Sequence, residues 1–118
     1  MHDYQRLRVW QAARDLAVDT YRFTESFPRH EIFGMTSQLR RSASSIAANI
    51  AEGAGRSSNR ELVRYLRISA GSASEYETHV TVASAVGLLD QEVGIDVLHQ
   101  VDSIKRMLHK LEASFRST

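Results

Sequence analysis

The sequence predicts an all-α protein, an antiparallel up-and-down four-helix bundle in which residues 1–118 form one domain. Three observations predict this fold. Four segments place apolar residues at steps of three and four, which is the spacing of one helix face. No segment shows the alternation or the hairpin signals of strands. The connections are short, so each helix is expected to run antiparallel to the one before it.

The first helix is expected over residues 3–25, and Pro28 ends it because the residue before a proline is disfavoured in the α conformation. Its core stripe consists of Val9, Ala13, Leu16, Thr20, Phe23 and Phe27. A second stripe, formed by Trp10, Ala17 and Tyr21, makes the apolar surface wider than one core contact needs. This second stripe predicts a contact between subunits, and the alternative is packing against the chain's own fourth helix.

The second helix is expected over residues 32–52. Its core stripe consists of Leu39, Ala43, Ile46 and Ile50. A separate polar stripe consists of Gln38, Arg41, Ser45, Asn49 and Glu52. Gly53 and Gly55 follow, and they supply the conformational freedom that helix ends commonly use.

The third helix is expected over residues 59–88, with Ser58 and Glu61 at the spacing of a capping box. Its core stripe consists of Leu62, Leu66, Ser69, Ala73, Tyr76, Val80, Ala83 and Gly87. Gly71 within a helix costs about 1 kcal/mol relative to alanine. We therefore expect a close helix crossing at Gly71.

The fourth helix is expected over residues 92–114. Its apolar stripe consists of Val97, Val101, Ile104, Leu108, Leu111 and Phe115. These residues alternate steps of four and three over nearly three heptads, which is the pattern of a helix in a bundle.

Charge is distributed unevenly along a chain whose net charge is only +1. Residues 36–72 carry a net charge of +4, residues 73–102 carry −6, and residues 103–118 carry +3. Such a distribution suits either an electrostatically matched contact between subunits or an anionic ligand on one face.

The patterns that carry enzyme chemistry are missing from the sequence. Di-metal bundles need a Glu-x-x-His pair on each of two helices, whereas Glu75, Glu77 and His79 have other spacings and occur once. Phosphate-binding glycine loops and nucleophile elbows are also missing. We therefore expect no catalytic residue, metal, cofactor or small-molecule substrate, and predict that the protein is not an enzyme.

The location expected from the sequence is the cytoplasm. The chain contains no cysteine, which fits a reducing compartment. It has no run of 18 or more apolar residues, and its first ten residues lack the apolar region of a signal peptide. Neither secretion nor membrane insertion is expected.

The polar stripe of the second helix has two interpretations. Gln38, Arg41, Asn49 and Glu52 would reach Glu75 on the third helix and form a structural polar network that fixes the register of the two helices. Alternatively, Glu52 and Glu75 would be paired carboxylates of an active site, although no nucleophile or metal signature accompanies them. The structural interpretation is preferred.

Four arginines precede and begin the third helix. Arg56, Arg60, Arg64 and Arg67 follow one another at steps of four, four and three and therefore line one face. They form either a solvated basic stripe with Glu61 as a partial partner or a contact for the phosphates of nucleic acid. Arginine favours bidentate contact with anions, which supports the second interpretation.

The run from Pro28 to Gly53, which contains QLRRSASSIAANIAEG, and the run LRISAGSASE from Leu66 to Glu75 resemble the bacterial four-helix bundle protein family. That family includes proteins encoded in intervening sequences of 23S rRNA genes and is related to the accessory variability proteins of diversity-generating retroelements. The positions that match its motif are Gln38, Arg40, Arg41, Asn49, Glu52, Gly53, Gly71, Ser72 and Glu75. The resemblance implies an antiparallel four-helix protomer and a ring-like homopentamer.

In the retroelement relatives, a strongly basic surface is linked to nucleic acid, whereas this chain is nearly neutral. The leading functional hypothesis is a non-enzymatic homo-oligomer, a pentamer by resemblance, that binds RNA or DNA through the four arginines repeated around a ring, with affinity raised by avidity. The alternative is a protein-binding scaffold or assembly factor that does not bind nucleic acid.

Overall fold

The computed structural model describes residues 2–116, which form four α-helices, two short 3-10 helices and no strand. The α-helices are α1 (Arg8–Thr24), α2 (Met35–Ala54), α3 (Asn59–Ala85) and α4 (Gln91–Arg116). The 3-10 helices are η1 (Tyr4–Arg6) and η2 (Arg29–Glu31). The all-α prediction is confirmed, and the four helices are consistent with the predicted bundle.

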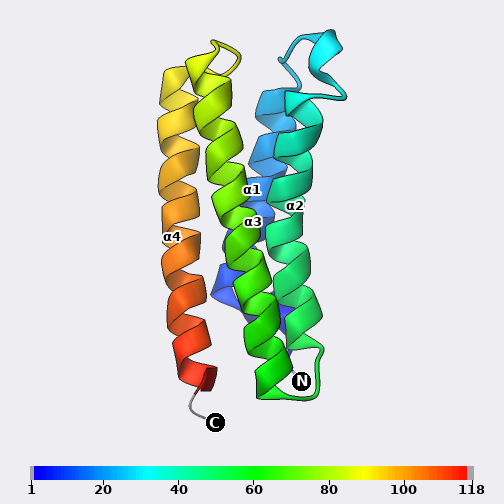
Figure 1. Cartoon of the computed structure of the whole chain (residues 1–118), viewed down its shortest axis with the longest axis vertical. Helices are drawn as coiled ribbons and strands as arrows, with labels where there is room; N and C mark the ends of the chain where they lie inside the picture. Colours follow the sequence, from blue (N-terminus) through cyan, green and yellow to red (C-terminus); the bar gives the residue numbers. More distant parts are fainter. Residues whose placement is uncertain (1, 117–118) are drawn as a thin grey trace.

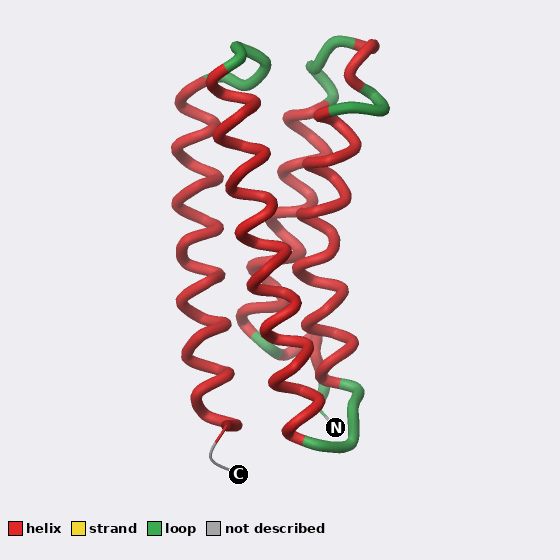
Figure 2. Tube along the Cα trace, viewed as in Figure 1, coloured by secondary structure: helices red, strands yellow, loops and turns green. Residues whose placement is uncertain are grey.

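The α-helices lie side by side along the long axis of a particle that measures 46 × 21 × 20 Å (Figure 1). The connections from α1 to α2 and from α3 to α4 lie at one end of the particle (Figure 2). The connection from α2 to α3 lies at the other end, close to where α4 finishes. The start of α3 and the end of α4 are therefore neighbours in space although they are far apart in sequence.

The first two helices begin later than their periodicity predicts. Asp3 caps η1, its Oδ1 accepting a hydrogen bond from the backbone N–H of Gln5 at 3.2 Å, and the extended Leu7 separates η1 from α1. At the second helix, the Oε1 of Glu31 accepts from the backbone N–H of Met35 at 3.0 Å. A carboxylate there satisfies a free N–H group and opposes the positive end of the helix dipole, so α2 begins at residue 35.

The third helix begins as predicted and ends three residues early. The Ser58 hydroxyl accepts a hydrogen bond from the backbone N–H of Glu61 at 3.2 Å, as a helix cap does. At the other end, Gly87 has a φ of 83°. The backbone N–H of Leu88 donates to the carbonyl of Ala83 at 2.9 Å. This reversal requires the left-handed conformation that glycine adopts without strain.

The predicted stripes form the buried core. The core residues of α1 and α2 include Val9, Ala13, Leu16, Leu39, Ala43, Ile46 and Ile50. Those of α3 and α4 include Leu62, Leu66, Ala73, Tyr76, Val80, Ala83, Val97, Val101, Ile104 and Leu108. Phe23, Leu111 and Phe115 are only partly buried and pack against this core. The helical periodicity therefore predicted the buried faces, except that Gly87, expected in the core stripe of the third helix, is exposed and lies in the turn after α3.

Tyr76 is fully buried, with 0% of its surface exposed, and its hydroxyl lies 2.6 Å from the hydroxyl of Thr20. Thr20 donates its own hydrogen to the carbonyl of Leu16 at 2.7 Å, so the Tyr76 hydroxyl must be the donor of the shared bond. Burial raises the pKa of Tyr76 to about 12. The phenol is therefore a neutral donor that links α3 to α1.

The sequence predicted a close helix crossing at Gly71. This prediction is wrong, because the close crossing lies at Gly53. A Cβ atom on Gly53 would lie 2.8 Å from the Cβ of Tyr65 and 3.3 Å from the carbonyl oxygen of Leu62. A Cβ atom on Gly71 would meet nothing within 4 Å, because this residue faces outward. The absence of a side chain at residue 53 is what lets α3 approach the end of α2.

None of the helices within residues 2–116 combines the length and the apolar character that a membrane-spanning helix requires.

Candidate nucleic-acid interface

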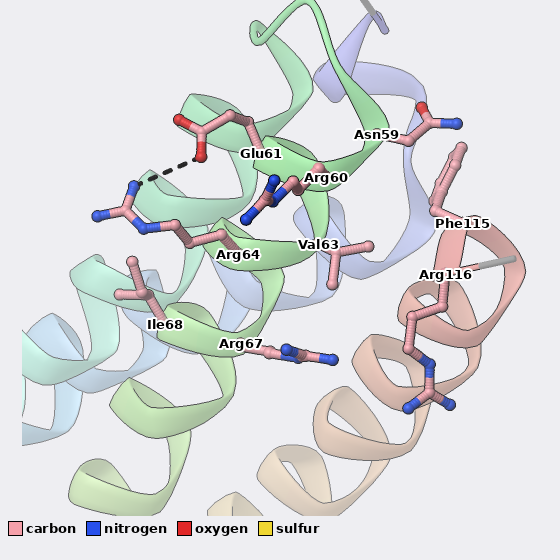
Figure 3. Close-up of a pocket in the computed structure, with 9 residues that line it drawn as sticks. All are labelled: Asn59, Arg60, Glu61, Val63, Arg64, Arg67, Ile68, Phe115 and Arg116. Atoms are coloured by element: carbon pink, nitrogen blue, oxygen red, sulfur yellow. Dashed lines mark ion pairs between the residues drawn. The ribbon is translucent and has the colours of Figure 1, made fainter. Parts of the chain in front are cut away.

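A groove with a volume of about 1080 Å³ lies where α3 begins and α4 ends. We call it the basic groove. Its lining residues are Asn59, Arg60, Glu61, Val63, Arg64, Arg67, Ile68, Phe115 and Arg116. Figure 3 shows side chains of α3 on one side of the groove and those of α4 on the other.

Four guanidinium groups border the basic groove. Arg60, Arg64 and Arg67 project from the first turns of α3, and Arg116 approaches from the end of α4 (Figure 3). Arg64 lies 3.8 Å from the carboxylate of Glu61. Arg60 is exposed and forms no ion pair within residues 2–116. Since Glu61 is the sole acidic residue in this described lining, the groove favours an anionic ligand.

Arg67 also bridges the two helices through an ion pair with Glu112. The hydrogen bond from Arg67 holds the pKa of Glu112 below its usual value. A lowered pKa means that this pair stabilises the folded state at neutral pH and stops doing so as the pH falls through the pKa of the folded protein. Arg67 therefore holds α3 against α4 and borders the groove at the same time.

Arg56 does not join the other three predicted arginines. It lies in the loop before α3, where its Nη2 donates to the hydroxyl of Tyr65 at 2.8 Å and approaches Glu52 at 3.4 Å. Its guanidinium carbon is also 4.9 Å from the centre of the Tyr65 ring, and that of Arg64 is 5.2 Å away. Arg56 thus stabilises the α2–α3 connection, and Arg116 is the fourth arginine of the basic groove.

Sequence periodicity did not identify Arg116, because it compares residues within one helix. The available signal was the predicted topology, in which the last turn of the fourth helix adjoins the first turn of the third. Arg116 in that last turn was therefore the arginine to pair with the α3 arginines.

Three lining residues of the basic groove, Val63, Ile68 and Phe115, carry apolar side chains, and we call them the apolar floor. Val63 is 7% exposed and Ile68 is 40% exposed. Phe115 is partly buried and packs against the core, and its ring meets the edge of the His2 ring with 5.2 Å between the centroids. The groove therefore combines cationic and apolar surface.

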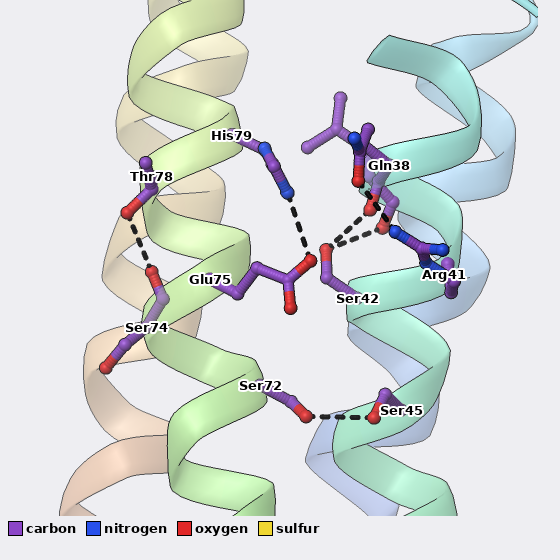
Figure 4. Close-up of polar contacts among 10 residues, drawn as sticks. Gln38, Arg41, Ser42, Ser45, Ser72, Ser74, Glu75, Thr78 and His79 are labelled. Carbon is purple, nitrogen blue, oxygen red and sulfur yellow. Dashed lines mark hydrogen bonds and ion pairs between the residues drawn. The ribbon is translucent and has the colours of Figure 1, made fainter. Parts of the chain in front are cut away.

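The predicted polar network linking Gln38, Arg41, Asn49, Glu52 and Glu75 is wrong as a single network. Figure 4 shows Arg41 beside Gln38 on α2 and Glu75 beside His79 on α3. Each side chain bonds within its own helix or the adjoining loop. The pairs are Arg41 with Gln38 at 2.9 Å, Asn49 with Ser45 at 3.0 Å, Glu52 with Arg56 at 3.4 Å and Glu75 with His79 at 3.2 Å. The five residues are therefore not a carboxylate site shared by α2 and α3.

Serines make the polar links between α2 and α3 instead. The hydroxyls of Ser45 and Ser72 lie 2.8 Å apart (Figure 4). The buried Ser69 donates to the carbonyl of Ile46 at 2.8 Å. Short side chains fit because the two helices pack closely, whereas the longer side chains of the polar stripe bond residues of their own helix or of the adjoining loop. Within residues 2–116, no three His, Asp or Glu side chains gather closely enough to hold a metal ion.

The second apolar stripe of α1 lines a smaller groove of about 480 Å³. Trp10, Ala17 and Tyr21 form one side of it, and Ser44 and Ala47 of α2 form the other. Among the described residues the lining contains none from α4. The stripe therefore lies beside α2, and a contact with the fourth helix is not needed to explain why the stripe is apolar.

The comparisons with known proteins agree with this fold. The sequence model of the 23S rRNA-intervening sequence protein family matches residues 5–110. A protein of unknown function of the S23 ribosomal protein family from Bacteroides thetaiotaomicron has a crystal structure that superposes with a TM-score of 0.79 and 23% sequence identity, covering 88% of this chain and 97% of that chain. No match was found among curated proteins. The chain therefore belongs to the 23S rRNA-intervening sequence protein family.

Proposed function

We propose that this protein is a non-enzymatic, cytoplasmic four-helix bundle protein with antiparallel helices that binds nucleic acid through the basic groove. The observation that carries the proposal is that Arg60, Arg64, Arg67 and Arg116, which come from two helices, line one groove. A planar guanidinium group matches the geometry of a phosphate, and several of them replace the counterions of a polyanion. A groove of this kind binds nucleic acid without requiring a high net charge on the whole chain.

Assembly into a ring-like homo-oligomer, a pentamer by resemblance to the family, completes this proposal. Outside the basic groove, residues 36–72 still carry Arg40, Arg41 and Arg56 against Glu52, so the net charge of −6 over residues 73–102 has a complementary positive surface on neighbouring copies. A ring would present one basic groove per subunit. One long nucleic acid could then occupy several weak sites together, which raises the overall affinity.

Reversing two charges of the groove tests nucleic-acid binding. Arg60→Glu/Arg64→Glu should lower the affinity for labelled RNA or DNA by about tenfold or more at low salt, because it removes two phosphate contacts and adds repulsion. Fluorescence anisotropy at several salt concentrations measures this, and the dependence of affinity on salt should become weaker in the variant.

The matched control is Arg29→Glu/Arg106→Glu, which makes the same change in net charge at exposed positions outside the groove. This control should keep most of the affinity. Wild-type protein that bound no nucleic acid even at low salt would contradict the proposal. The alternative function, a protein-binding scaffold or assembly factor, would then be preferred.

The contact between subunits is proposed to involve Trp10, Ala17 and Tyr21. These residues border a groove that is also lined by Val18, which is 42% exposed, and by Arg14 and Arg22. Trp10→Glu should shift the protein from its assembled form to smaller species, because a carboxylate would be buried in an apolar contact. Sedimentation velocity measures the shift, with Trp10→Phe as the control. A Trp10→Glu protein that stayed fully assembled would reject this interface.

A further inference from the structure

We infer that the ligand of the basic groove is single-stranded nucleic acid, whose bases contact the apolar floor while its phosphates contact the arginines, with Phe115 as the stacking surface. This inference rests on the proposed function and names the class of nucleic acid that the groove selects. It follows from the apolar composition of the floor, because contact with phosphates alone does not explain why apolar side chains line the groove.

The floor is apolar where a site for phosphates alone would be polar. Val63, Ile68 and Phe115 line the groove together with the four arginines. Ile68 is 40% exposed although it belongs to the third helix of a packed bundle. Leaving such surface in water is unfavourable, and covering it with an apolar ligand surface is favourable. The ligand is therefore expected to carry both anionic groups and flat apolar groups.

A duplex does not present that combination to an outer groove. Its bases are stacked, so that only their edges are exposed in the grooves while their flat faces are covered, and phosphates and sugars form the rest of its outer surface. A single strand exposes the faces of its bases next to its phosphates, so both can be bound together. Basic grooves with aromatic side chains bind single strands in this way, because every base has a face that stacks on an aromatic ring.

Phe115 is the aromatic residue in the lining of the groove, and the structure restricts its movement. It packs against the core, and the His2 ring meets it edge-on with 5.2 Å between the centroids. His2 is itself held, because its backbone N–H donates to the carbonyl of Ala54 at 2.8 Å. Figure 3 shows Phe115 beside Arg116 and across the groove from the arginines of α3. A base at Phe115 would therefore have its phosphates within the arginine border.

Three labelled ligands separate contact with bases from contact with phosphates. They are a single strand of about 15 nucleotides, an abasic strand with the same phosphates, and the duplex of the same sequence. Measured by anisotropy at one salt concentration, the full-length protein should bind the single strand about tenfold more tightly than the abasic strand or the duplex. RNA and DNA versions of the single strand distinguish the two sources of this ligand.

Phe115→Leu keeps an apolar side chain against the core and removes the aromatic face. It should weaken binding of the single strand by about tenfold and leave the abasic strand and the duplex unchanged. Phe115→Tyr should restore the wild-type preference. Thermal unfolding of each variant shows whether the bundle is intact.

Two results would overturn the inference alone. One is equal affinity for all three ligands that Arg60→Glu/Arg64→Glu abolishes. The other is an unchanged preference for the single strand in a folded Phe115→Leu protein. Absence of binding to every ligand would overturn the inference and the proposed function together.

Discussion

Replacing Tyr76 with alanine should lower the free energy of unfolding by about 3–5 kcal/mol. Tyr76 is among the largest fully buried side chains, so its removal leaves a cavity that the surrounding helices cannot fill completely. It also removes the hydroxyl that donates to Thr20 and links α3 to α1. Urea unfolding followed by circular dichroism measures the loss, which would bring a domain of ordinary stability close to unfolding.

Tyr76→Phe is the matched control, because it keeps the ring and removes only the hydroxyl. It should cost about 1 kcal/mol at neutral pH. The wild-type protein should in addition lose stability as the pH rises from 10.0, the ordinary pKa of tyrosine, to about 12, its pKa in the folded protein. The sign follows from the raised pKa, since the unfolded chain releases this proton first. Parallel pH profiles of the wild type and Tyr76→Phe between these values would contradict the assignment to Tyr76.

Replacing Gly53 with valine should lower the free energy of unfolding by about 3 kcal/mol. The added Cβ would lie 2.8 Å from the Cβ of Tyr65 and 3.3 Å from the carbonyl oxygen of Leu62. The carbonyl oxygen limits how far the new Cβ could move away from Tyr65. Because Cβ atoms cannot rotate away, the ends of α2 and α3 would have to separate. Thermal and urea unfolding measure the effect.

Gly71→Ala is the control for Gly53→Val, because it also adds a side chain at a glycine in one of the two packed helices, α2 and α3. Nothing lies within 4 Å of the added methyl group, so only helix propensity changes. The protein should become more stable by up to about 1 kcal/mol. Equal stability of Gly53→Val and the wild type would show that residue 53 does not determine how closely the helices pack.

The parts of the fold that depend on residues close together in the sequence were predictable. The steps of three and four identified the buried faces, and Ser58 with Glu61 identified the first turn of α3. The starts of α1 and α2 were not predictable in this way. The backbone of Leu7 is extended just before α1, and the carboxylate of Glu31 accepts a hydrogen bond from the first residue of α2. The spacing of hydrophobic residues reveals neither feature.

The glycines show the same division. Gly71 has the position of a helix crossing in the sequence, whereas its added Cβ would lie in open space. Gly53 has the position of a helix end, and it is where the third helix comes close. The sequence shows where a residue has no side chain, but only the packing of the helices determines whether another helix occupies the space beside that residue.

The spacing of residues within single segments predicted the four helices, their buried faces and three of the four arginines of the basic groove, because these features repeat along one helix. Helix packing placed Arg116 with Arg60, Arg64 and Arg67, directed Arg56 to Tyr65 and brought Phe115 into the lining of the same groove. A groove between two helices depends on how each helix is rotated about its axis and on where its ends meet the other helix. Because the packing of the whole core sets both, no single segment of the sequence contains this information.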